Sequence, residues 1–241
     1  MTSRVITIPA KGFVSGGIAP YREDKMLKAV FFDLDGTLLN TIPDIHACIN
    51  ASLEKFGYPT IDEAHTQAYV GDGAKLLVER ALPAHCPDLE AVFADFHARF
   101  AADSSERTHL YPDELTVLCA LKARGFRLAV ITNKPQDAAD AVLKKFFPAG
   151  TFDFVGGDTG MFPCKPDPSL ARYAALRLHL SPAECAFVGA GEPDARVAQN
   201  AGMYGISVLW GYRTRSQLEG AGATVFADSF LALQKILEKL C

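Results

Sequence analysis

Five short apolar runs recur along the chain, and each is bounded by turn residues. Each run is rich in residues that favour β-structure and is too short for a helix. Fully apolar strands of this kind are typical of a parallel sheet whose two faces are both covered. The runs lie at residues 28–34, 127–132, 152–157, 185–190 and 205–210.

Amphipathic helical patterns separate most of these runs. They cover residues 113–124, 136–146, 168–179, 193–201 and 228–239. Strands that alternate with helices are typical of α/β proteins. We therefore predict an α/β fold with a doubly wound, Rossmann-like parallel-sheet core formed by residues 27–42 and 112–241.

The first two strands are separated by an unusually long connection. It contains only helical patterns, at residues 43–56, 62–69, 73–82 and 88–102. Such a connection is too long for one crossover, so we predict a helical cap subdomain at residues 43–111. Residues 1–26, which carry Gly, Pro and mixed charges, are predicted to form an N-terminal extension.

Composition narrows the class of partner. The chain has 24 basic and 28 acidic residues, a net charge of −4, which gives no electrostatic reason to expect nucleic acid or an anionic membrane. No apolar run reaches the length of about 18 residues that a membrane helix needs. The six cysteines are widely separated and read as reduced thiols of a cytoplasmic protein. A small phosphorylated metabolite is the expected partner, and the chain is expected to be a monomer or a homodimer.

The stretch FFDLDGTLLNT, residues 31–41, carries the strongest candidate chemistry. Asp33 and Asp35 follow the first predicted strand, at the edge where open α/β sheets place their ligands. An Asp-Gly turn or an EF-hand fragment is the alternative, but Gly36 stands at the fourth position of the acidic run and not at the sixth. A buried strand, then two carboxylates, then an amphipathic helix favours a functional site.

Two later strand ends extend this pattern. VITNKP, residues 130–135, supplies Thr132 and Asn133, and CKPDP, residues 164–168, supplies Lys165. With these three marks in order, the chain resembles the haloacid dehalogenase superfamily. The resemblance implies a phosphate-binding set, which consists of Gly36, Thr132, Asn133 and Lys165.

The resemblance also implies a mechanism. Asp33 would attack a phosphoryl group, and Asp35 would protonate the leaving oxygen and then activate water. Mg²⁺, held by Asp33, Asp35 and Asp194, would be the cofactor. Dehalogenases of the family lack the second aspartate, so Asp35 favours hydrolysis of a phosphate ester.

The segment CAFVGAGEPDARVAQNAG, residues 185–202, departs from the family pattern. The family usually has G-D-x-x-x-D here, and Ala190 replaces the first, metal-binding aspartate. Three explanations stay open: an introduced substitution, a natural variant that binds Mg²⁺ through Asp194, or a protein that binds phosphate ligands without turnover. We expect a working framework with a weakened metal site and catalysis slowed by roughly 10–100-fold or more.

The cap segment YVGDGAKLLVERAL, residues 69–82, resembles that of bacterial phosphoglycolate phosphatases, as does VLWGYR at residues 208–213. This makes 2-phosphoglycolate the leading substrate. For the charged candidates a solvated surface position is the alternative. The candidate cap contacts are Gly71, Gly73, Lys75 and Arg80, with Arg213 as a further candidate in the core.

Two other functions stay open at this point. A phosphonate hydrolase would use a cap lysine, Lys55 or Lys75, as a Schiff base, although Asp35 argues against it. A phosphate-ligand binder made inactive by Ala190 is the alternative outside enzyme function.

Overall fold

The computed structural model describes residues 26–103 and 106–240, so the expected N-terminal extension lies outside the described residues except for Met26. Its core is a six-stranded sheet with the strand order β5-β4-β1-β6-β7-β8. Every neighbouring pair of strands in this sheet is parallel. The sheet confirms the predicted α/β class and the doubly wound core.

Strand β1 occupies the centre of the sheet. It pairs in register with both neighbours, Ala29 lying opposite Arg127 and Cys185. All four of its residues are buried, which explains the unbroken apolar run. The strands are β1 Ala29–Phe32, β4 Arg127–Pro135, β5 Phe154–Asp158, β6 Cys185–Gly189, β7 Tyr204–Val208 and β8 Phe226–Ala227.

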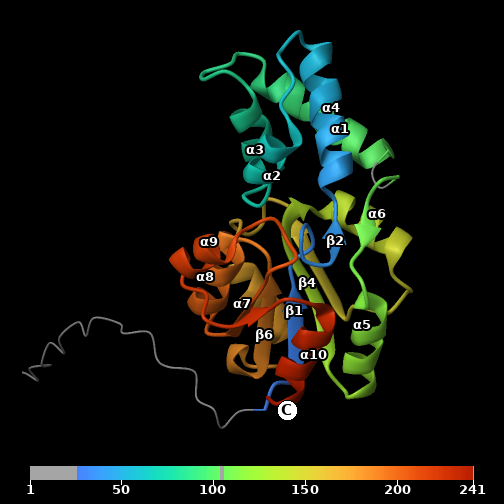
Figure 1. Cartoon of the computed structure of the whole chain (residues 1–241), viewed down its shortest axis with the longest axis vertical. Helices are drawn as coiled ribbons and strands as arrows, with labels where there is room; N and C mark the ends of the chain where they lie inside the picture. Colours follow the sequence, from blue (N-terminus) through green and yellow to red (C-terminus); the bar gives the residue numbers. More distant parts are fainter. Residues whose placement is uncertain (1–25, 104–105, 241) are drawn as a thin grey trace, which may run out of the picture.

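Helices cover both faces of the sheet and pack into two separate apolar clusters (Figure 1). One face carries α5 Glu114–Ala123, α6 Gln136–Phe146 and α10 Phe230–Glu238. The other face carries α7 Ser169–Arg177 and α8 Glu192–Ala201. The ligand edge of the sheet, at the carboxyl end of β1, is left free of these helices.

Four further helices form the region expected to be a cap, and Figure 1 shows them together at one end of the molecule. They pack around an apolar cluster of their own, built from residues such as Ile49, Leu53 and Val92. Their bounds are α1 Ile42–Lys55, α2 Glu63–Tyr69, α3 Ala74–Ala81 and α4 Leu89–Asp103.

Several short elements were not predicted from the sequence. The strands β2 Leu39–Asn40 and β3 His109–Leu110 pair antiparallel where the chain leaves the core and where it returns. Helix α9 Arg215–Gly220, a 3₁₀ turn at Pro182–Glu184 and strand β8 are the others. Two-residue strands and single turns show no readable periodicity, because a period needs several repeats. Across the described ranges, we find no helix with the length and apolar character that crossing a membrane requires.

Candidate active site

Asp33 follows β1 directly and meets a buried lysine. Lys165 Nζ lies 2.7 Å from Asp33 Oδ1 and 2.6 Å from Asp194 Oδ1. All three side chains are buried, and they come from three different segments of the core. One ammonium is therefore shared by two carboxylates at the carboxyl edge of the sheet.

Asp194 is held in place by the start of helix α8. Its Oδ2 accepts a hydrogen bond of 2.9 Å from the backbone N–H of Gly191, so the side chain caps its own helix. Its carboxylate lies over Gly189, where an added Cβ would come within 2.3 Å of Asp194 Cβ. Gly189 is thus required for this close approach, and both oxygens of Asp194 are already engaged.

Asp35 meets a second buried lysine, which the sequence analysis did not single out. Lys134 Nζ lies 2.9 Å from each oxygen of Asp35, and the hydroxyl of Thr41 donates to Asp35 Oδ1 at 2.8 Å. The Lys134 side chain is only 4% exposed. Strand β4 extends to Pro135, so Lys134 lies two residues beyond Thr132 in the same strand, and both residues line the cavity described below.

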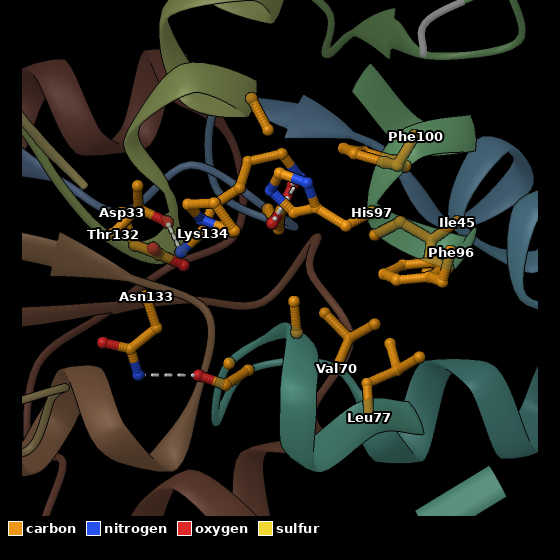
Figure 2. A pocket seen from close by; sticks show the side chains of 16 residues that line it. Asp33, Ile45, Val70, Leu77, Phe96, His97, Phe100, Thr132, Asn133 and Lys134 are labelled. Atoms are coloured by element: carbon orange, nitrogen blue, oxygen red, sulfur yellow. Dashed lines mark hydrogen bonds and ion pairs between the residues drawn. The ribbon is translucent and has the colours of Figure 1, made fainter. Parts of the chain in front are cut away.

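Thr132 and Asn133 occupy the expected edge but differ in what they contact. Thr132 is buried, and its Oγ1 accepts from the backbone N–H of Lys134 at 3.2 Å. The Asn133 amide donates to the backbone carbonyls of Gly71 at 3.0 Å and Lys165 at 3.2 Å, and its oxygen accepts from Lys165 N–H at 2.7 Å. Asn133 therefore links Gly71 of the cap to the backbone of Lys165, and Figure 2 shows its bond toward the cap.

A cavity opens between these residues and the cap (Figure 2). Its empty volume is about 570 Å³, its opening to solvent included. The core side offers Asp33, Asp35, Thr132, Asn133 and Lys134. The cap side is mostly apolar and consists of Ile45, Val70, Leu77, Phe96 and Phe100, with His97 among them.

The candidate cap contacts divide into two groups. Gly71 and Gly73 line the cavity, as does Ala74. Lys75 instead pairs with Glu90, and Arg80 pairs with Asp72 at 2.6 Å. Neither charged side chain lines the cavity; both are partly exposed and engaged with acidic neighbours within the cap.

Gly36 shapes the loop after β1 but does not line the cavity. Its φ of +83° lies in the left-handed region, and an added Cβ would come within 2.9 Å of the Tyr212 ring. The Tyr212 hydroxyl in turn accepts from Thr41 N–H at 2.9 Å. Gly36 thus allows the WGYR segment to lie against the catalytic loop.

Arg213, from the same segment, is a tie between core and cap. Its guanidinium pairs with Glu192 at 2.8 Å and donates to the carbonyls of Gln67 and Val70, each at 2.8 Å. These bonds occupy the donors that a substrate carboxylate would need.

Ala190 lies in the apolar core cluster of the sheet and is 3% exposed. A Cβ added at Gly211 would come within 2.3 Å of the Ala190 methyl group, so the backbone of this loop packs directly on it. The methyl group offers no ligand atom to a cation at this edge.

The buried cluster of Asp33, Asp194 and Lys165 has shifted pKa values. Burial, reinforced by the charge of Asp194, raises the pKa of Asp33 to about 7, against the opposing effect of Lys165. Burial alone would lower the pKa of Lys165, but Asp194 and Asp33 together raise it above the usual lysine value. Lys165 therefore stays charged, and Asp33 takes up a proton under mildly acidic conditions.

The expected metal-binding set of Asp33, Asp35 and Asp194 does not come together as a cluster. Within residues 26–103 and 106–240, no group of three or more His, Cys, Asp or Glu side chains is arranged to hold a metal ion. Lysines contact all three carboxylates, and Ala190 adds no oxygen. The residues present do not fit a Mg²⁺ site built from three carboxylates.

Comparisons with known proteins identify the family of the chain. A family profile described as haloacid dehalogenase-like hydrolase matches residues 27–202. The chain is 34% identical over 223 residues to a phosphoglycolate phosphatase of Vibrio cholerae, covering 88% of this chain and 98% of that protein. It is 37% identical over 218 residues to one of Rhodospirillum rubrum, covering 86% and 90%.

A solved structure is similar in fold. The crystal structure of a predicted phosphoglycolate phosphatase from Haemophilus somnus 129pt superimposes with a TM-score of 0.81 at 29% identity. The match covers 87% of this chain and 97% of that one. Both the core and the helical region above it are therefore shared with that structure.

Proposed function

Because this chain belongs to the haloacid dehalogenase-like hydrolases and is a phosphoric monoester hydrolase, we propose that its leading substrate is 2-phosphoglycolate. The observation that carries the proposal is the pairing of Asp33 and Asp35 at the carboxyl end of β1, where both line the cavity between core and cap. The relatives named above support the choice of substrate.

The first step is transfer of the phosphoryl group to Asp33. A carboxylate oxygen of Asp33 forms a bond to phosphorus while the ester P–O bond breaks, and the leaving oxygen takes a proton from the Asp35 carboxyl group. The products of this step are glycolate and an aspartyl phosphate. Asp35 reaches the leaving oxygen because it lines the same cavity as Asp33.

The second step releases phosphate. Water attacks phosphorus, Asp35 accepts a proton from that water, and the bond between phosphorus and the Asp33 oxygen breaks. Lys165 holds Asp33 through its 2.7 Å contact and places a fixed positive charge beside the transferring group. Thr132, buried at the next strand end, is proposed to donate its hydroxyl to a phosphate oxygen.

The cavity lining supports a small acid as the leaving group. Among the described cap residues that line it, His97 is the one with a hydrogen-bonding side chain, and its Nε2 lies 3.5 Å from Asp137 Oδ1. We therefore assign His97 to the substrate carboxylate, in place of Lys75 and Arg80. The apolar residues around it exclude water from the reaction.

A divalent metal ion is the cofactor that phosphatases of this family generally use, and Mg²⁺ is the expected ion because its preferred ligands are oxygens. The steps above do not depend on it, since the described carboxylates do not form the site that it needs.

A Schiff-base phosphonate hydrolase finds no support in this cavity. Lys55 pairs with Asp95 and Lys75 with Glu90, each with a half-exposed ammonium. Neither cap lysine lines the cavity. Borohydride with phosphonoacetaldehyde is therefore expected to leave the protein unlabelled.

The test of the substrate assignment compares two esters. Initial rates of phosphate release are measured with 2-phosphoglycolate and with ethyl phosphate, which lacks the carboxylate. We expect His97→Ala to raise the KM for 2-phosphoglycolate about tenfold, the effect of one lost hydrogen bond to a charged group, and to leave ethyl phosphate unchanged. His109→Ala, on the exposed strand β3, is the control. Equal effects on both esters would contradict the assignment.

A further inference from the structure

Lys134 is a buried, charged side chain in this site to which the proposed mechanism assigns no role. Its Nζ lies 2.9 Å from each Asp35 oxygen, and its side chain is 4% exposed. Its ammonium also lies 4.2 Å from the centroid of the Phe100 ring, on cap helix α4. A lysine is rarely this deeply buried unless the site uses its charge or pairs it.

The surroundings of Lys134 are also where a divalent cation would have to bind. Asp35 is one of its expected ligands and is occupied on both oxygens by Lys134. Asp194, a second expected ligand, is occupied by Lys165 and by the N–H of Gly191. At position 190 the side chain is a buried methyl group. The oxygen ligands are thus missing or bound to ammonium groups.

We propose that the Lys134 ammonium supplies the positive charge that a divalent metal ion would supply next to Asp35, so that this chain hydrolyses its phosphate ester without added metal. This inference rests on the proposed function for its catalytic part. Its structural part, that Lys134 keeps a divalent ion from Asp35, stands on geometry alone.

An ammonium is suited to this place for physical reasons. Lysine is a compact point charge with three donors, so it can contact both Asp35 oxygens and still direct a proton into the cavity that it lines. Mg²⁺ demands about six oxygen ligands in octahedral order, and Ala190 removes one of them. The Phe100 ring and the Asp35 carboxylate together hold the Lys134 ammonium in place.

During the reaction the charge has a defined use. When Asp35 gives its proton to the leaving oxygen, the carboxylate that forms is already beside Lys134. Lys165 contacts Asp33, to which the phosphoryl group is transferred, and Lys134 contacts Asp35, so each of the two aspartates has its own ammonium. Removing one such charge from a water-poor site typically costs about 10²–10³ in rate.

The first test measures cation binding without turnover. Binding of Mn²⁺ alone is followed by electron paramagnetic resonance for the full chain, for Lys134→Met and for Lys144→Met, an exposed lysine on α6 that serves as the matched control. We expect Lys134→Met to bind Mn²⁺ at least about tenfold more tightly than the other two, because Asp35 becomes free. Equal affinity in all three proteins would overturn the proposal.

The second test measures the metal dependence of phosphate release. With EDTA present, the full chain and Lys144→Met are expected to keep their rates with 2-phosphoglycolate, and Lys134→Met to lose about 10²–10³-fold. Lys134→Arg, which keeps the charge, should retain part of the EDTA-resistant rate. Lys134→Gln is a second neutral variant in case Met destabilises the fold. If EDTA abolishes phosphate release by the unsubstituted protein and Mg²⁺ restores it, the proposal is overturned.

The two tests separate this proposal from the proposed function. If no phosphate is released under any metal condition, the proposed function fails, and Mn²⁺ binding still decides whether Lys134 excludes a divalent ion. If phosphate is released only with Mg²⁺, the proposed function stands and the role of Lys134 is wrong.

Discussion

Asp33 and Asp194 are two buried carboxylates that share one ammonium, and this imbalance sets the chemistry of Asp33. A single Lys165 compensates part of their charge, so burial and repulsion together raise the pKa of Asp33 to about 7. A nucleophile has to be unprotonated, so the working state of Asp33 forms only as pH rises.

This predicts the pH dependence of the reaction. Below about pH 7 Asp33 holds a proton and cannot attack, so kcat/KM should rise about tenfold per pH unit up to that point. In Asp194→Asn the repulsion between Asp194 and Asp33 is removed, and Asp33 becomes the one described carboxylate that the Lys165 ammonium contacts. The pKa of Asp33 should fall, so the rising part of the kcat/KM profile should move to lower pH. Rates measured from pH 5 to 9 check this, and a limb at the same pH in both proteins would contradict it.

The alanine at position 190 removes an expected metal ligand, and its surroundings differ from a metal site as well. From the sequence, a missing aspartate predicted a damaged metal site. The structure adds that Gly211 packs on the methyl group and that Lys134 and Lys165 occupy the carboxylates nearby. The loss of one ligand is thus accompanied by two ammonium groups that bind the remaining oxygens.

At the scale of elements, the periodicity of the sequence predicted most of the longer strands and helices. The five long strands and the helices on both faces were predicted from apolar runs and amphipathic patterns. The positions of Asp33, Asp35 and Lys165 followed from strand ends. Lys134 was missed because the strand was expected to end at residue 132, whereas β4 extends to Pro135 and Lys134 lines the cavity together with Thr132. The alternation of Thr132 and Lys134 in VITNKP was the available signal.

The sequence could not show that the charged side chains of the cap pair with acidic residues on its surface. Lys75 and Arg80 lie in a helix next to a Gly-rich turn, and their distance from the cavity depends on how α3 is rotated against its neighbours. Their acidic partners, Glu90 and Asp72, draw them to the surface of the cap. Arg213 was a candidate for the substrate and instead joins two elements.

Arg213 gives a prediction about that junction. Arg213→Met removes the ion pair with Glu192 and the bonds to the carbonyls of Gln67 and Val70. We expect a stability loss of about 1–3 kcal/mol in urea unfolding, since buried acceptors lose their donors, and a KM raised several-fold with kcat nearly unchanged. Arg215→Met, an exposed neighbour, is the control. A kcat loss larger than the KM change would show that Arg213 takes part in the chemistry instead.

Helix α5 gives a prediction about pH and stability. Burial raises the pKa of Glu114, its first residue, to about 9 in the folded protein, from an ordinary value of 4.5. Between these values the unfolded chain loses a proton that the folded chain keeps, so the stabilising effect present below pH 4.5 is lost as pH rises toward 9.

Glu114→Gln removes this titration. The variant should gain at least about 1 kcal/mol over the parent at pH 8.5 and almost nothing at pH 4.5, measured by urea unfolding. The exposed Glu54→Gln on α1 should show no such trend. A Glu114→Gln effect that does not vary with pH would contradict the argument.

At the scale of the whole molecule, the site exists only because core and cap meet. The core supplies the carboxylates and lysines, and the cap supplies the apolar wall and His97 (Figure 2). Asn133 and Arg213 bond the backbone of the cap from the core side, at Gly71 and at Val70. The Phe100 ring reaches back to Lys134. The fold therefore ties the position of the cap to the charges that the reaction uses.

One measurement tests the central claim most directly: labelling of the chain during turnover of ³²P-labelled 2-phosphoglycolate, followed by acid quenching and peptide mapping. We predict phosphate release with label on the peptide that contains Asp33, and neither release nor label in Asp33→Asn. Label-free protein with no phosphate release, or release that persists in Asp33→Asn, would contradict the account.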